Sequence, residues 1–238
     1  MSTSTVNLTN ETRDKTKTVL DINKVDFDKL TIVKSGRTVK LLYDNKPFQF
    51  LTSCLYTPFG LSSVKKEWSM FEDFSISCSL RLSEEKVAFE KFINDLDERV
   101  KILVNDNLSI LDPKGVYTQV DFLSSLKQNG NYPKLIKLQF VRDKNGNVES
   151  FIFDEDKKSV WVDETNIDEL ITKGKCFRCA IECSKIWLYN GKVGIIWNIN
   201  QLKFERSTNN YTPDTFEEPE EVSNKNLYNK LLINDDDD

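Results

Sequence analysis

The sequence of 238 residues contains no histidine. This absence removes the imidazole from any serine or cysteine nucleophile pair, from any metal site and from the role of general base. A phosphate-binding Gly-x-x-x-x-Gly-Lys loop is also missing, because Gly191-Lys192-Val193-Gly194 is too short and suits a strand after a turn. The remaining carboxylates and lysines form no recognisable catalytic set. We therefore expect a protein that is not an enzyme and needs no cofactor.

Long apolar runs are absent as well. None approaches the roughly 18 residues that a membrane-spanning helix needs, and the Ser/Thr-rich start lacks the apolar segment of a signal peptide. We expect no membrane association, no secretion, and a location in the cytoplasm or nucleus.

Cysteine is limited to five residues, an odd number that argues for reduced thiols. Cys176, Cys179 and Cys183 have a spacing that superficially suits a metal. In an extended strand, however, Cys176 and Cys179 point to opposite faces, and no second pair completes a four-ligand site. We expect packed free thiols and no metal.

Acidic residues gather at the end of the chain. Residues 207–238 hold nine Asp and Glu and two Lys, so the preceding 206 residues hold 31 basic and 29 acidic side chains, a net charge of +2. A basic body with an acidic tail suits a protein whose groove binds a polyanion and whose tail competes for that groove. A tail that only promotes solubility is the alternative. We divide the chain into a disordered N-terminal arm at 1–24, a folded domain at 25–206 and a flexible acidic tail at 207–238.

The folded domain has mainly β patterns. Residues 30–42 predict two strands around Ser35-Gly36, and residues 74–82 alternate apolar and polar side chains. Strands resume at Lys134, with a turn at 143–146, and one or two helical turns are expected at 167–172. Asn190-Gly191 is the preferred dipeptide for a two-residue hairpin turn between two long strands.

One long helix interrupts this pattern. Apolar residues recur at helical spacing after Ser83, a suitable N-cap: Phe89, Phe92, Ile93, Leu96, Val100, Leu103 and Val104. The next segment, 113–133, reads as a loop with a short helix at 122–127. The fold class that follows is mainly β with one long helix, of the α+β type.

Aromatic and basic residues interleave on several of the short strands. Rings that stack on bases and lysines that follow phosphates are what sequence-tolerant binding of a single strand requires. About half of the aromatics must instead build the core. The residues we predict for a nucleic-acid groove are Arg37, Lys40, Tyr43, Lys65, Lys66, Trp68, Lys137, Arg178, Lys185, Trp187, Lys192 and Trp197.

The order of these elements resembles a known family. The chain is similar in this order to the single-stranded DNA-binding proteins of podovirus-type phages and of nucleocytoplasmic large DNA viruses. The order is strands, a long helix, strands with a Lys-Asn-Gly turn, the segment 175–189 (KCFRCAIECSKIWLY) running into 191–204 (GKVGIIWNINQLKF), and an acidic tail. Residues 25–40 (VDFDKLTIVKSGRTVK) also resemble the opening of the asfarvirus member.

The resemblance implies an OB-fold-like barrel with a helical insertion, whose concave face binds single-stranded DNA. It also implies a tail that occupies the groove when DNA is absent and recruits replication proteins when DNA is bound. Phage members end their tail in an aromatic residue, whereas this chain ends in four Asp. The implied role is sequence-independent single-stranded DNA binding in viral replication, recombination or repair, in the cytoplasm or nucleus of a host cell.

Two other functions fit the sequence. A virion structural or assembly protein would use the β-rich body for packing, with an exposed apolar patch and no salt-dependent DNA affinity. A replication or transcription scaffold would present an apolar groove to protein. The sequence leaves homo-oligomerisation open.

Overall fold

The computed structural model describes residues 19–67, 69–80, 84–128 and 130–206. Five strands close a ring: β5 (Leu55–Tyr56), β7 (Glu72–Leu80), β10 (Leu135–Phe140), β13 (Cys176–Tyr189) and β14 (Lys192–Phe204). β5 pairs with β7, β7 with β10, β14 with β13 and β13 with β5, all antiparallel, while β10 and β14 are parallel. Around the ring the strands follow one another as β5, β7, β10, β14 and β13, so the fifth strand in the sequence lies between the third and the fourth. This closed five-stranded ring is an OB-like barrel, as predicted.

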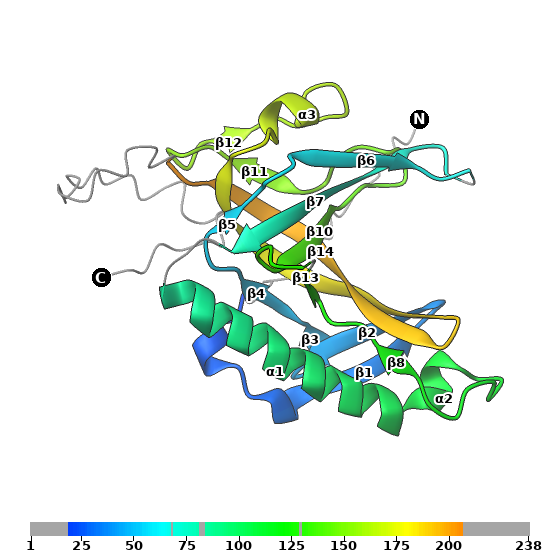
Figure 1. Ribbon diagram of the computed structural model, residues 1–238. Helices are drawn as coiled ribbons and strands as arrows, with labels where there is room; N and C mark the ends of the chain where they lie inside the picture. Colours follow the sequence, from blue (N-terminus) through cyan, green and yellow to red (C-terminus); the bar gives the residue numbers. More distant parts are fainter. Residues whose placement is uncertain (1–18, 68, 81–83, 129, 207–238) are drawn as a thin grey trace, which may run out of the picture.

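Shorter strands extend the barrel at its edges. β2 (Thr38–Tyr43) and β4 (Gln49–Leu51) pair with β13, whereas β1 (Leu30–Ser35) and β3 (Lys46–Pro47) pair with β2. β6 (Leu61–Lys65) pairs with β7. β11 (Phe151–Phe153) is parallel to β14, and β12 (Ser159–Val160) pairs with β11. The β11–β12 end and the β13–β14 turn therefore lie at opposite ends of β14 (Figure 1).

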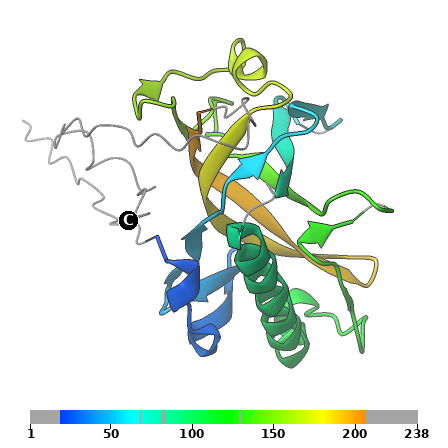
Figure 2. The same ribbon diagram turned by 60° about the vertical axis from the view of Figure 1, so that its left-hand side comes forward.

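The helix α1 (Glu84–Asp106) is inserted between the second and third strands of the ring. Its predicted stripe is buried, since Phe89, Ile93 and Leu96 are fully inaccessible to solvent. The stripe meets Phe50, whose ring centroid lies 5.0 Å from that of Phe92 and 5.4 Å from that of Trp197. Figure 2 shows α1 at one end of the barrel, with the β1–β2 hairpin nearby. The expected cap, Ser83, lies outside the described residues.

The turns follow the predicted chemistry. Gly36, between β1 and β2, has φ 61°, and both Asn190 and Gly191 have positive φ, as the two-residue turn between β13 and β14 requires. The helical turn α3 (Ile167–Leu170) is also where the sequence places one. Within the described residues, no helix has the length and apolar character to cross a membrane.

Two expectations about local structure are wrong. Residues 122–127 form no helix; instead β8 (Asp121–Phe122) pairs with β14 and β9 (Leu126–Lys127) pairs with β10. Tertiary strand pairing outweighs the weak helical pattern there. Order also begins before residue 25, because the Leu20 amide donates to the Gln49 carbonyl at 3.0 Å and Ile22–Lys24 form a 3-10 turn. The helix α2 (Leu108–Leu111) was not anticipated.

The cysteines are free thiols in the structure. Cys179 and Cys183 are buried in the barrel, while Cys176 lies on the opposite side of β13 and is partly exposed. Burial raises the pKa of the Cys183 thiol to about 12. The two buried thiols are therefore packed as small apolar groups.

Candidate nucleic-acid interface

The outer face of the barrel is defined by strand alternation. On β10, Ile136, Leu138 and Phe140 are buried, so Lys137 and Gln139 point outward. On β14, Trp197 and Ile199 are buried, which places Ile196 and Asn198 on the outside. The parallel pairing of Leu138 with Trp197 aligns these two outward rows.

The same face continues across the β13–β14 hairpin. The register pairs Lys185 with Ile196, Trp187 with Gly194 and Tyr189 with Lys192, all on the outer side. Ile186 pairs with Val39 of β2, and both side chains are buried. Lys40, the next residue of β2, therefore lies on the same face as Lys185.

A groove of about 210 Å³ lies on this face. One wall is the segment 123–127, and the floor comes from β10, β13 and β14. The groove is lined by Leu123, Ser124, Ser125, Lys127, Lys137, Gln139, Trp187, Gly194, Ile195, Ile196 and Trp197. It thus combines two lysines, one accessible indole and several hydroxyl and amide groups.

Several lysines on this face have no ion-pair partner among the described residues. Lys40, Lys127, Lys137, Lys185 and Lys192 form no ion pair with any side chain in the described part of the chain. The outward acid Glu182 instead accepts a hydrogen bond from Asn200 Nδ2 at 2.8 Å. Such a face attracts a polyanion, and that attraction weakens as salt rises.

Trp187 lies directly over Gly194. A Cβ atom at residue 194 would come within 2.7 Å of Cζ2 of the Trp187 indole. Glycine is therefore required for the ring to lie against the groove floor. A base that enters the groove would meet the outer side of this half-buried ring.

We expect Gly194→Ala to lift Trp187 from the floor. Because the ring would then be misplaced for stacking, affinity for oligo-dT should fall by about tenfold, while the thermal unfolding temperature changes little. Fluorescence anisotropy and a thermal melt of the same sample measure both. Unchanged affinity would contradict a role for this ring position.

A buried carboxylate supports the groove wall. Asp97 of α1 is 5% exposed and accepts hydrogen bonds from Ser124 Oγ at 2.9 Å, Ser125 N at 2.7 Å and Ser125 Oγ at 2.8 Å. Ser125 Oγ in turn accepts from the Trp197 indole nitrogen at 3.0 Å. Asp97 therefore ties the helix, the wall segment and the barrel core together. Burial raises the pKa of Asp97, although the bonds from Ser125 and Ser124 oppose the rise.

The raised pKa of Asp97 gives a testable pH dependence. Between 3.8, the ordinary value, and the raised value, the folded state binds more protons than the unfolded state. The free energy of unfolding should therefore fall as pH rises through that window. Asp97→Asn lacks this titration, so the stability difference between wild type and variant, measured by urea unfolding, should grow as pH falls. A difference that shrinks would mean that the three hydrogen bonds outweigh burial.

Several predicted residues lie elsewhere. Trp197 is 2% exposed, so the prediction that it stacks on a base is wrong. Arg178, at the far end of β13, pairs with Glu85 at 2.9 Å and Glu205 at 3.4 Å. These partners fix its guanidinium against α1 and away from the groove. Desolvation by burial lowers the pKa of Arg178, but the bond and charge of Glu85 and the charge of Glu205 raise it overall.

The N-terminal hairpin contributes unevenly. Arg37 lies exposed in the β1–β2 turn, and Lys40 joins the outer face. Tyr43 is structural, since its hydroxyl accepts from the Asp26 amide at 3.3 Å and its ring packs 6.1 Å from that of Phe48.

The predicted cluster at 65–68 stands apart from the groove. Lys65 ends β6 and is exposed, whereas Lys66 forms an ion pair with Asp73. Trp68 lies outside the described residues. Of the twelve predicted residues, the outer face brings together Lys40, Lys137, Lys185, Trp187 and Lys192.

Sequence reasoning missed Lys127, Gln139 and Gly194. Lys127 and Gln139 carry no motif, and only the pairing of β9 and β10 brings Lys127 beside Lys137. Gly194 had a usable signal, because a two-residue turn at 190–191 fixes the register and places residue 194 opposite Trp187. The close approach of a ring is a standard reason for glycine in a strand.

The fold and the face together define a class: an OB-like barrel with a basic, aromatic groove on its outer surface. No protein family model matches the chain, and no curated protein matches it either. Among solved structures, the chain is similar to gp2.5, a single-stranded DNA-binding protein encoded by bacteriophage T7. The two sequences are 10% identical, the match covers 71% of this chain and 98% of that chain, and the TM-score is 0.47. The single-stranded DNA-binding protein of bacteriophage Enc34, in complex with single-stranded DNA, gives 12% identity, coverage of 75% and 96%, and a TM-score of 0.45. The fold assignment itself rests on the strand pairings of this chain.

Proposed function

We propose that this protein is a non-catalytic, sequence-independent single-stranded DNA-binding protein. The observation that carries the proposal is the groove around Trp187, flanked by five lysines that form no ion pair with any side chain of residues 19–67, 69–80, 84–128 and 130–206. OB-folds bind oligonucleotides on the face of their second and third strands and with the loop between the fourth and fifth. Here the third strand is β10, which supplies Lys137, and that loop is the Asn190-Gly191 turn.

The binding mode follows from the side chains. Lys40, Lys137, Lys185 and Lys192 contact phosphates, which carry no sequence information. The Trp187 ring stacks on a base, and every base offers a π face. A duplex keeps its bases stacked on one another, so its base faces cannot reach the indole. The arrangement therefore favours single strands over duplex without selecting a sequence.

The biological setting is also part of the proposal. The sequence resemblance described above supports a role in the replication, recombination or repair of a large DNA virus. In that role the acidic segment 207–238 would compete with DNA for the groove and recruit replication proteins.

The test is a titration of labelled oligo-dT and of a matched duplex with the full chain at two salt concentrations, followed by fluorescence anisotropy. We expect tight binding to the single strand, weaker binding to the duplex, and a steep loss of affinity with salt. Equal binding to both forms, or none at low salt, would overturn the proposal.

A further inference from the structure

A second, larger groove lies further along the same outer face, at the β11–β12 end. Its volume is about 760 Å³. Two exposed aromatic side chains line it: Trp161 is 80% exposed and Phe151 is 61% exposed. Both belong to segments outside the five-stranded ring, so the groove is an addition to the barrel (Figure 1).

The two grooves follow one another along two strands. On β10 the outward residue Gln139 lines the first groove, and Val141, the next outward residue after the strand, lines the second. On β14 Ile196 lines the first and Asn200 the second. At about 3.3 Å per residue, Asn200 lies about 13 Å beyond Ile196. One extended ligand on this face can therefore contact both.

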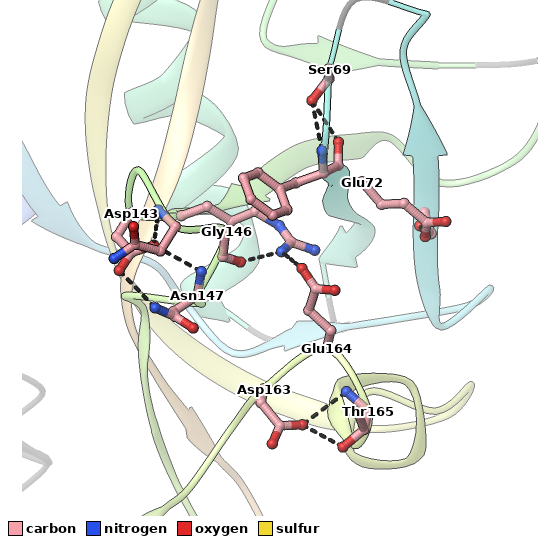
Figure 3. A network of polar contacts seen from close by, with 12 residues as sticks. Ser69, Glu72, Asp143, Gly146, Asn147, Asp163, Glu164 and Thr165 are labelled. Atoms are coloured by element: carbon pink, nitrogen blue, oxygen red, sulfur yellow. Dashed lines mark hydrogen bonds and ion pairs between the residues drawn. The ribbon is translucent and has the colours of Figure 1, made fainter.

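Hydrogen bonds hold the loops around the second groove in place. Asp143 accepts bonds from the Asn147 amide and from Asn147 Nδ2, each at 2.8 Å, which fixes one edge of the groove (Figure 3). Arg142 bonds to the Gly146 carbonyl and to Glu164, and so joins this loop to the segment after Trp161. The Trp161 carbonyl accepts from Asn166 Nδ2 at 3.0 Å. The exposed rings thus stand on a preformed frame.

We propose that Trp161 and Phe151 form a second base-stacking site, which takes unstacked nucleobases of the same single strand that occupies the first groove. This inference rests on the proposed function. The ring faces suit nucleobases, and Asn200, whose Nδ2 is bonded to Glu182, lines the same groove and can offer its amide oxygen to a base edge. The second groove carries the carboxylates of Glu149 and Asp163 and no lysine. The bases therefore enter the second groove while their phosphates stay in solvent.

The test compares Trp161→Ala and Phe151→Ala with wild type on oligo-dT of increasing length. Lengths from about 4 to 16 nucleotides cover the site sizes of OB-folds. Each variant should lose roughly 5- to 150-fold in affinity for long oligomers, the range of one stacked base, and nothing for the shortest. The salt slope should stay unchanged, because no phosphate contact is removed.

Two controls separate stacking from damage to the fold. Trp161→Phe keeps a ring and should retain wild-type affinity to within a few-fold. Phe59→Ala removes another exposed ring, 71% accessible, that lines neither groove, and should change nothing. Thermal unfolding of all four variants should match wild type.

The outcomes distinguish the two proposals. Wild-type binding of oligo-dT with no effect of Trp161→Ala or Phe151→Ala at any length would overturn the second site and leave the proposed function standing. Absence of single-strand binding by wild type would overturn both.

Discussion

A variant with Lys137, Lys185 and Lys192 all replaced by alanine is expected to bind oligo-dT about a hundredfold more weakly than wild type at 0.1 M salt. Each phosphate contact to a single strand contributes about 0.7 to the slope of log K against log salt, so three lost contacts lower that slope by about 2. All three side chains are exposed, so the variant should fold normally. Anisotropy titrations across a salt series give both quantities.

The matched control removes the same charge from elsewhere. Lys24, Lys91 and Lys101 are exposed and pair with Asp21, Asp95 and Glu98 at 3.3, 2.6 and 3.4 Å. Their triple alanine variant should keep the wild-type salt slope and change affinity only through long-range electrostatics, by a few-fold at most. If both triple variants lose affinity equally, net charge rather than the outer face determines binding.

Trp197 and Trp187 should respond to substitution in opposite ways. Trp197→Ala empties a site in the core beside Phe50 and should lower the free energy of unfolding by about 3–5 kcal/mol. Trp187→Ala should leave stability nearly intact, because the ring is half-buried on the surface, and weaken oligo-dT binding by about 1–3 kcal/mol. Chemical denaturation and anisotropy measure the two effects.

Because Trp197→Ala can fail to fold, Trp197→Phe provides the binding test. It keeps an aromatic core and loses the hydrogen bond to Ser125 Oγ, at a cost of about 1 kcal/mol in stability. It should bind oligo-dT within about threefold of wild type. A large loss of affinity in a folded Trp197→Phe protein would restore Trp197 to the binding site.

Local sequence signals predicted the elements that depend on near neighbours. The apolar stripe from Phe89 to Val104 predicted α1, and Asn190-Gly191 predicted the turn that pairs Trp187 with Gly194. The alternation of apolar and polar residues on β7 and β10 also predicted which side chains of these strands point into the barrel. These patterns arise from periods of 3.6 and 2 and need no tertiary information.

Features that depend on distant pairing were less accessible. The segment 122–127 becomes two short strands only because β14 and β10 offer free edges. Cys183 and Trp187 lie four residues apart on β13 and would share a face in a regular strand, but an irregularity in register between Cys183 and Lys185 leaves Cys183 inside the barrel and Trp187 outside it. The sequence alone predicts that Arg178 is a cation of the groove, whereas in the structure its Nη2 donates to Oε1 of Glu85, on α1, at 2.9 Å.

The central claim is that a single strand lies along the outer face of β10, β14 and β13. Amide hydrogen exchange of the full chain, with and without saturating oligo-dT and read by mass spectrometry, tests that placement most directly. The account predicts slower exchange in residues 121–127, 135–140 and 185–196, and little change in the buried stripe of α1. Slower exchange confined to α1 or to residues 61–67, with none in the hairpin, would contradict it.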